Sequence, residues 1–185
     1  TVTALRVARV NKIAGDTRPI APAKRGRDFR RVASAPERSG GAPVRALLDV
    51  NVLIALCDAQ HQFHAPATHW ILKHAAKGWA SCPLPQNGCV RILSQPNYPN
   101  TRPVAQVLAQ MRLMLASKAH EFWPDDACLL DTQQFKHEHI HGHRQITDLY
   151  LLGLAVKHGG HLVTLDGNIP LSAVIGSKRQ HLTVL

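Results

Sequence analysis

The stretch VRALLDVNVLIALCD, residues 44–58, places two polar residues inside a run of apolar ones. Its dense Val, Leu, Ile and Ala content predicts burial, yet Asp49 and Asn51 stand in the middle of the run. An unpaired buried carboxylate costs several kcal/mol, or its pKa shifts until the group is neutral. The presence of Asp49 in a core-forming stretch therefore needs an explanation from the rest of the chain.

The charge of the chain is unevenly distributed. The 185 residues are 45% hydrophobic, which is enough for one domain with a real core and some additional length. The formal net charge is +10, but residues 1–43 contain 10 Lys and Arg against 3 Asp and Glu. Residues 44–185 contain 12 against 9. The basic character therefore belongs mainly to the first 43 residues.

This basic segment, residues 1–43, is rich in Arg, Pro, Gly, Ser and Ala and has no sustained helical or strand period. Such a composition predicts disorder. Two interpretations remain open for it. It is either a basic arm that contacts nucleic acid through phosphate charge, or a transit-like or upstream segment without a role in the fold. Residues 44–185 are expected to form the folded domain.

Apolar runs of strand length alternate with amphipathic stretches of helix length after residue 43. The expected strands are 44–50, 79–84, 120–124, 161–166 and 181–185. The expected helices are 64–77, 87–96, 104–117, 125–139 and 147–160, the last with Thr147 as its cap and Gly159-Gly160 as its end. This alternation predicts an α/β fold with a mainly parallel sheet and helices on both faces.

Neither a membrane segment nor a disulfide framework is expected. No stretch approaches the 18 or more apolar residues that span a bilayer. The four cysteines show no CxxC spacing, which favours reduced core thiols in a cytoplasmic protein over a disulfide or zinc site.

Three carboxylates are expected at one edge of the sheet. Asp49 and Asp166 each end an apolar strand, and Asp148 lies in the first turn of a helix. Sites in open parallel sheets form outside the carboxyl ends of the strands, so these acids should converge. The helix dipole alone would favour Asp148 at its position, but it does not explain the two strand-end acids. Because three like charges repel unless a cation lies between them, the pattern predicts a divalent-metal site with oxygen ligands, suited to Mg²⁺ or Mn²⁺.

Several separated motifs, in order, resemble the PIN-domain family. They are LLDVNVLIALCDAQHQFH, CPLPQNGCVRILSQP, HEFWPDD, GHRQITDLYLLGLA and HGGHLVTLDGNI, and the match covers about residues 44–185. Within that family the chain is similar to the VapC-type toxins of bacterial toxin–antitoxin pairs.

The resemblance implies a three-layer α/β/α fold and a Mg²⁺-dependent endoribonuclease, commonly a homodimer, that a small antitoxin holds inactive. It assigns Asp49, Asp148 and Asp166 to the first, third and fourth acids of the family. Gln86 stands where many relatives carry the second acid, a Glu, so this chain has one charge fewer there.

Other residues are secondary candidates. Asn51 and Thr147 could orient the acids, and Arg91 is either a partner of the acids or substrate or a surface residue. The alternating histidines His137, His139, His141 and His143 are expected to form a solvated loop rather than a zinc or nickel site, with His143 or Arg144 as a candidate phosphate contact.

Three rival functions remain. The first is a catalytically weakened module that binds RNA, which the missing Glu favours. In the second, binding of the antitoxin is itself the relevant activity. The third is a phosphatase of the haloacid-dehalogenase type, which the sequence disfavours because that chemistry needs DxD where this chain has Asn51.

Overall fold

The structure is a computed structural model, and it describes residues 44–185. The expectations for residues 1–43, including the domain boundary after residue 43, lie outside these described residues. Within the described part, all four cysteines are free thiols, with Cys57, Cys82 and Cys89 buried and Cys128 exposed. None of the helices in residues 44–185 combines the length and the apolar character needed to cross a membrane.

Five short parallel strands form one sheet in the described chain. They are β1 (Ala46–Leu48), β2 (Trp79–Ser81), β3 (His120–Phe122), β4 (His161–Thr164) and β5 (Leu182–Val184), in the spatial order β3-β2-β1-β4-β5. The chain builds outward from β1 on one side and then returns to build outward on the other. The strand order therefore reverses between β1 and β4, the point at which open parallel sheets form their sites.

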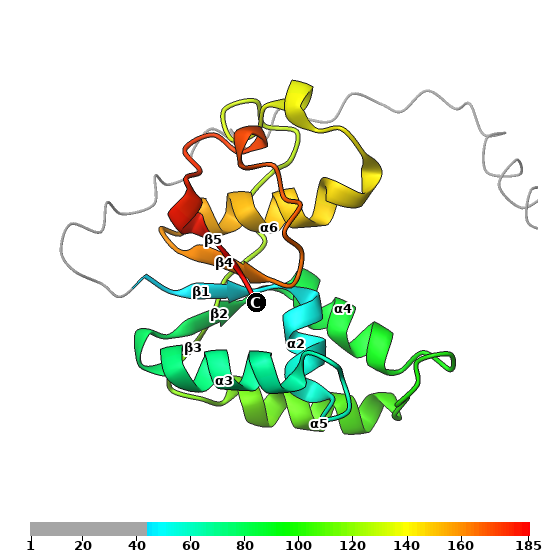
Figure 1. Cartoon of the computed structure of the whole chain (residues 1–185). Coiled ribbons are helices and arrows are strands. Elements are labelled where there is room, and N and C mark those ends of the chain that lie inside the picture. Colours follow the sequence, from blue (N-terminus) through cyan, green and yellow to red (C-terminus); the bar gives the residue numbers. More distant parts are fainter. Residues whose placement is uncertain (1–43) are drawn as a thin grey trace, which may run out of the picture. The chain divides into compact units, whose positions relative to one another are not determined.

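Helices cover both faces of this sheet (Figure 1). The helices α2 (Val50–Cys57), α3 (His64–His74), α4 (Pro83–Leu93) and α5 (Val104–Leu115) lie on one face, and α6 (Ile146–Lys157) lies on the other. Short 3-10 helices connect these elements, at Ala75–Lys77, His137–His139, His143–Gln145, Leu171–Ala173 and Arg179–His181. The predicted α/β/α layering with a parallel sheet is confirmed.

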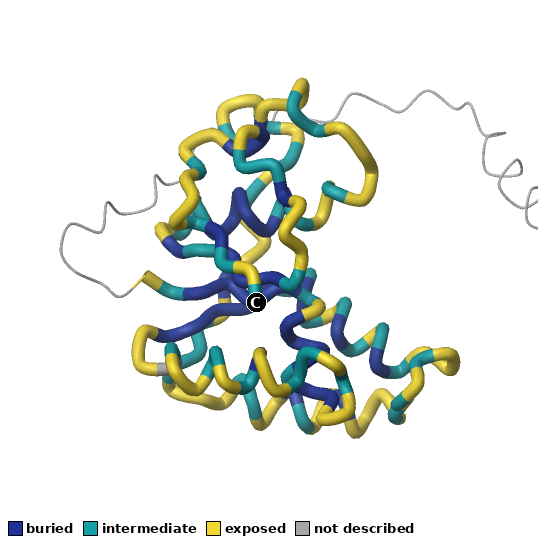
Figure 2. The backbone as a smooth tube through the Cα atoms, in the orientation of Figure 1, coloured by how far each residue is buried: buried dark blue, intermediate teal, exposed yellow. Residues whose placement is uncertain are grey.

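The alternation of side chains along the strands divides the core into two clusters. Leu47 points into the cluster under α6, whereas its neighbours Ala46 and Leu48 point into the cluster under α2 to α5. The buried tube in Figure 2 runs through the middle strands and continues into α2 and α6. Both faces of the sheet are therefore buried, as the near-continuous apolar strands predict.

The helix expected over 125–139 is wrong, because the segment is a series of turns ending in a 3-10 helix. Asp131 Oδ1 accepts a hydrogen bond from the backbone N–H of Gln133 at 2.8 Å, which fixes a turn. Phe135 forms an isolated antiparallel bridge with Val174 and packs so closely on Gly153 that a Cβ there would lie 2.3 Å from the phenyl ring. Packing of one aromatic ring against α6 therefore overrides the local helical pattern.

The predicted capping role of Thr147 is also wrong. Helix α6 begins at Ile146, and Gln145, at the N-cap position, has αR backbone angles and makes no side-chain cap. The preceding 3-10 helix His143–Gln145 runs directly into α6, so the chain has no extended residue at which a cap could form. Thr147 is instead an exposed residue of the first turn.

Two further helix starts differ from the prediction. Helix α2 follows Asp49 immediately, where the sequence analysis predicted no separate helix. Helix α4 begins at Pro83 rather than at residue 87, because Pro83 and Pro85 fit the first turn, where missing N–H groups cost nothing.

Candidate functional site

Asp49 is fixed between a strand and a helix. Its backbone N–H donates to the carbonyl of Val163 at 3.0 Å, and its own carbonyl accepts the first bond of α2 from Leu53 at 3.0 Å. Its carboxylate caps α2 through the N–H of Val50 (2.6 Å) and accepts from the hydroxyl of Thr164 at 3.0 Å. Asp49 is 1% exposed, and these bonds hold both its backbone and its carboxylate in place.

Thr164 connects the first acid to the fourth. Its Oγ1 donates to Asp49 Oδ2 and accepts the backbone N–H of Asp166 at 3.1 Å. Asp166 is exposed, and its Oδ1 accepts from the N–H of Asn168 at 2.8 Å, which closes a turn after β4. The hydroxyl of Thr164 therefore sets the relative position of Asp49 and Asp166 on the two sides of the switch point, the place between β1 and β4 where the strand order reverses.

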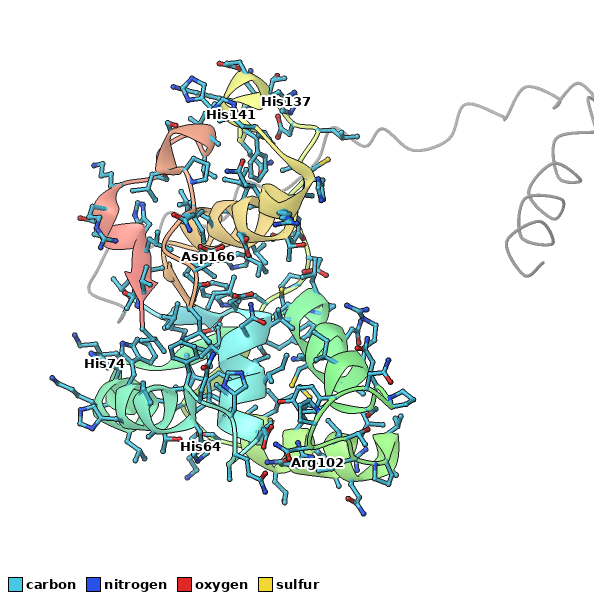
Figure 3. All side chains as sticks on the ribbon, turned by 45° about the vertical axis from the view of Figure 1, so that its right-hand side comes forward. His64, His74, Arg102, His137, His141 and Asp166 are labelled. Carbon is cyan, nitrogen blue, oxygen red and sulfur yellow. The ribbon has the colours of Figure 1, made fainter. Side chains whose placement is uncertain are left out.

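Asp148 in the first turn of α6 completes the group. Burial, then the charge of Asp49, then that of Asp166 raise the pKa of Asp148 to about 6. Burial also raises the pKa of Asp49, with a further contribution from Asp166, although the hydrogen bonds from Thr164 and Val50 oppose the change. The structure therefore brings the three predicted acids close enough to repel one another (Figure 3 labels Asp166 beneath α6).

The donor chemistry of the three acids fits a hard divalent cation. Carboxylate oxygens are the protein ligands that Mg²⁺ and Mn²⁺ prefer. Within residues 44–185, however, no three His, Cys, Asp or Glu side chains already form a complete ligand set for one ion.

Three of the secondary candidates, Asn51, Arg91 and Thr147, form no side-chain hydrogen bond to the acids within residues 44–185. Asn51, Arg91 and Thr147 are all exposed. Asn51 contributes only its backbone N–H, which lowers the pKa of Asp49 slightly.

Gln86 is turned toward the opposite side of the sheet. Its Nε2 donates to Ser81 Oγ at 2.8 Å, and Ser81 Oγ lies 2.8 Å from His120 Nε2. Burial lowers the pKa of His120, which favours the neutral ring beside the Ser81 hydroxyl. Side-chain alternation places Ser81 on the α2 to α5 face with Trp79, whereas Asp49 and Thr164 lie on the α6 side.

The sequence analysis missed Thr164. The available signal was a hydroxyl residue inside the apolar strand HLVTLD, two positions before Asp166. A buried hydroxyl needs a partner, and a strand-end acid beside it is an obvious one.

Comparisons with known proteins agree with the class that the motifs indicate, although no family model matches the chain. Ribonuclease VapC44 of Mycobacterium tuberculosis is 45% identical over 142 residues, which is 77% of this chain and 100% of the relative. Ribonuclease VapC39 of the same organism is 41% identical over 133 residues, covering 71% of this chain and 95% of the relative.

Two solved structures are more distant. VapBC2 from Rickettsia felis, bound to a DNA fragment from its promoter, has a TM-score of 0.47 at 15% identity and covers 65% of this chain and 87% of that chain. VapC20 of Mycobacterium tuberculosis, described as a toxin that cleaves the sarcin-ricin loop, has a TM-score of 0.46 at 14% identity. The match covers 66% of this chain and 91% of that chain. On the evidence of the sequence relatives, the chain belongs to the VapC family, the ribonuclease toxins of toxin–antitoxin pairs.

Proposed function

We propose that Asp49, Asp148 and Asp166 form the catalytic site of this ribonuclease and bind a divalent cation, Mg²⁺ or alternatively Mn²⁺. The observation that supports this assignment is the raised pKa of Asp148, because Asp49 and Asp166 contribute to it. Two of these acids flank the switch point of the sheet. Repulsion among the three is relieved by a cation that all of them attract.

Each acid has a distinct role in this proposal. The bound ion supplies positive charge that stabilises the charge developing on the phosphodiester. Asp49, held by Thr164 and the α2 backbone, is the rigid ligand, and Asp166 is the exposed residue that substrate reaches first. Asp148, half-buried in the first turn of α6 beside the other two acids, is the candidate general base for the attacking water.

Membership of the VapC family supports an antitoxin protein as the partner. The simplest inhibitor is an Arg side chain whose guanidinium pairs with these carboxylates. We also propose that the protein forms a homodimer, because α3 and α5 expose the apolar side chains of Leu72 and Leu113, with exposed fractions of 74% and 80%. We propose the cytoplasm as its location.

A second candidate function is a catalytically weakened module that binds RNA or antitoxin. It is favoured by Gln86, which brings no charge and bonds Ser81 instead of the acids. The two candidates differ in whether purified protein cleaves RNA when a divalent cation is supplied.

The test is an RNA cleavage assay with and without EDTA. Asp148→Asn keeps the shape of the side chain and removes its charge, so cleavage should fall at least about tenfold, more than about 1.4 kcal/mol of barrier. Asp131→Asn is the matched control, because Asp131 fixes a turn elsewhere and Asn can still accept the Gln133 N–H. Full EDTA-sensitive activity in a folded Asp148→Asn protein would refute the site, and cleavage-free binding of RNA by the unmodified protein would favour the second candidate.

A further inference from the structure

A pocket of about 320 Å³ lies at the amino ends of the strands, opposite the acids. Ala46 and His161, the first residues of β1 and β4, line it together with Trp70, His74 and Lys77 from α3 and the turn that follows. Figure 3 shows His74 on α3, well separated from Asp166. The volume falls at the lower end of the range for small-molecule sites.

The aromatic wall of this pocket is preorganised. The rings of Trp70 and His74 stack with centroids 4.5 Å apart and planes at 20°, and His161 meets Trp70 edge-on at 6.3 Å and 68°. His74 Nδ1 lies 2.8 Å from the carbonyl of Trp70. Because a carbonyl oxygen only accepts, Nδ1 carries the hydrogen, and Nε2 of His74 can donate to an anionic ligand when the ring is in its imidazolium form.

The pocket also carries positive charge that no carboxylate in its lining offsets. None of the described residues that line it is Asp or Glu. His161 is surrounded by other basic groups, since after burial the charges of His74, Lys77 and His181 each lower its pKa. An anion is the ligand that such a cluster favours.

We propose that this pocket binds a nucleotide, with its phosphate at Lys77 and His74 and its base beside Trp70. Stacking surface and positive charge side by side are the two elements that single nucleotides and single-stranded RNA require. A free nucleoside monophosphate and a nucleotide within RNA share this chemistry. The site is separate from the acids and does not depend on their catalytic role.

Calorimetry on the full chain in EDTA tests the ligand class, because without a cation the acids repel phosphate. Adenosine 5′-monophosphate should bind at least about tenfold more tightly than inorganic phosphate or adenosine, since only it uses both the charge and the aromatic wall. Equal affinity for phosphate and nucleotide, or no binding at millimolar nucleotide, would overturn the proposal.

Paired variants test the location. Lys77→Gln and His74→Gln should each weaken nucleotide binding at least about fivefold, whereas Lys73→Gln and His69→Gln should not. Lys73 and His69 are exposed residues of the same helix that do not line the pocket. Equal losses in the control variants would show binding to general surface charge.

Nuclear magnetic resonance supplies a readout that a structural role would not change. A phosphate bound at Lys77 and His74 should raise the pKa of His161, because it offsets the two charges that lower it, and an unchanged pKa under saturating nucleotide would exclude the pocket. A short RNA with the Asp148→Asn protein distinguishes the sources. If Lys77→Gln weakens the binding of RNA and of the nucleotide alike, the ligand is a nucleotide within RNA. If it weakens only the binding of the nucleotide, the ligand is a free nucleoside monophosphate.

Discussion

The two ends of the same sheet carry opposite charge. At the carboxyl ends of the strands lie Asp49, Asp148 and Asp166, and at the amino ends lie the basic groups of the pocket. In a parallel sheet the connection between two strands runs from the carboxyl edge back to the amino edge, so a helix that directly follows a strand begins at the carboxyl edge and a helix that leads into a strand ends near the amino edge. Asp148 stands in the first turn of α6, and Lys73 and His74 stand in the last turn of α3, as helix dipoles favour. The helix dipoles therefore favour acidic side chains at one edge and basic side chains at the other, and these side chains in turn attract cations and anions.

The largest expected effect comes from removing the bond that positions the acids. Thr164→Val keeps the side-chain volume but takes the donor from Asp49 and the acceptor from Asp166. RNA cleavage should fall about tenfold, and the free energy of unfolding should fall by about 1–3 kcal/mol because a buried carboxylate loses its partner. Thr147→Val is the control at the same edge, and it should change neither quantity. Equal activity in the two variants would show that Asp49 needs no orientation from β4.

A smaller effect concerns the stability of the acidic edge without metal. The raised pKa of Asp148 means that the folded protein binds more protons than the unfolded chain between the ordinary Asp value of about 4 and about 6. Stability should therefore fall as pH rises through that window, by on the order of 1 kcal/mol after solvent screening, or roughly 2–4 °C in melting temperature.

The measurement is a melting curve in EDTA for the unmodified protein and for Asp148→Asn, compared at each pH. The difference between the two curves removes the contribution of other titrating groups, and Asp148→Asn should show a smaller decline, because the raised pKa of Asp49 remains. Adding Mg²⁺ near neutral pH should restore stability only in the unmodified protein. Parallel curves for the two proteins would contradict the electrostatic account of the acidic edge.

The smallest expected effect separates Gln86 from the acidic edge. Gln86→Glu should leave the Mg²⁺ concentration for half-maximal cleavage unchanged, because the side chain bonds Ser81 on the other face of the sheet. It should lower the free energy of unfolding by about 0.5–1.5 kcal/mol, since a carboxylate cannot donate to Ser81 Oγ. Gln106→Glu, at an exposed position of α5, is the control for added charge. A lower Mg²⁺ requirement in Gln86→Glu but not in Gln106→Glu would show that residue 86 does contribute to the metal site with the three acids.

The sequence predicts those parts whose signal is local. Apolar runs ending in Asp49 and Asp166 identify β1 and β4, and the helical periods of α5 and α6 are clear, so the fold class and the meeting of three acids follow. The turns over 125–139 are not predictable from the local pattern, because Phe135 and Gly153 meet only in the folded chain. The same holds for the site: the acids are visible as exceptions in apolar runs, but the Thr164–Asp49 bond and the Ser81–His120 contact join residues of neighbouring strands that are far apart in the sequence.

The shortness of the strands has an electrostatic consequence. Strand β1 spans Ala46–Leu48, so at about 3.3 Å per residue the two edges lie only about 10 Å apart along it. That length equals the Debye length at an ionic strength of about 0.1 M, and the Debye length grows to about 30 Å at 0.01 M. In dilute salt an approaching polyanion therefore meets the fields of both edges at once, with attraction and repulsion partly cancelling, and rising salt weakens the contribution of the more distant edge.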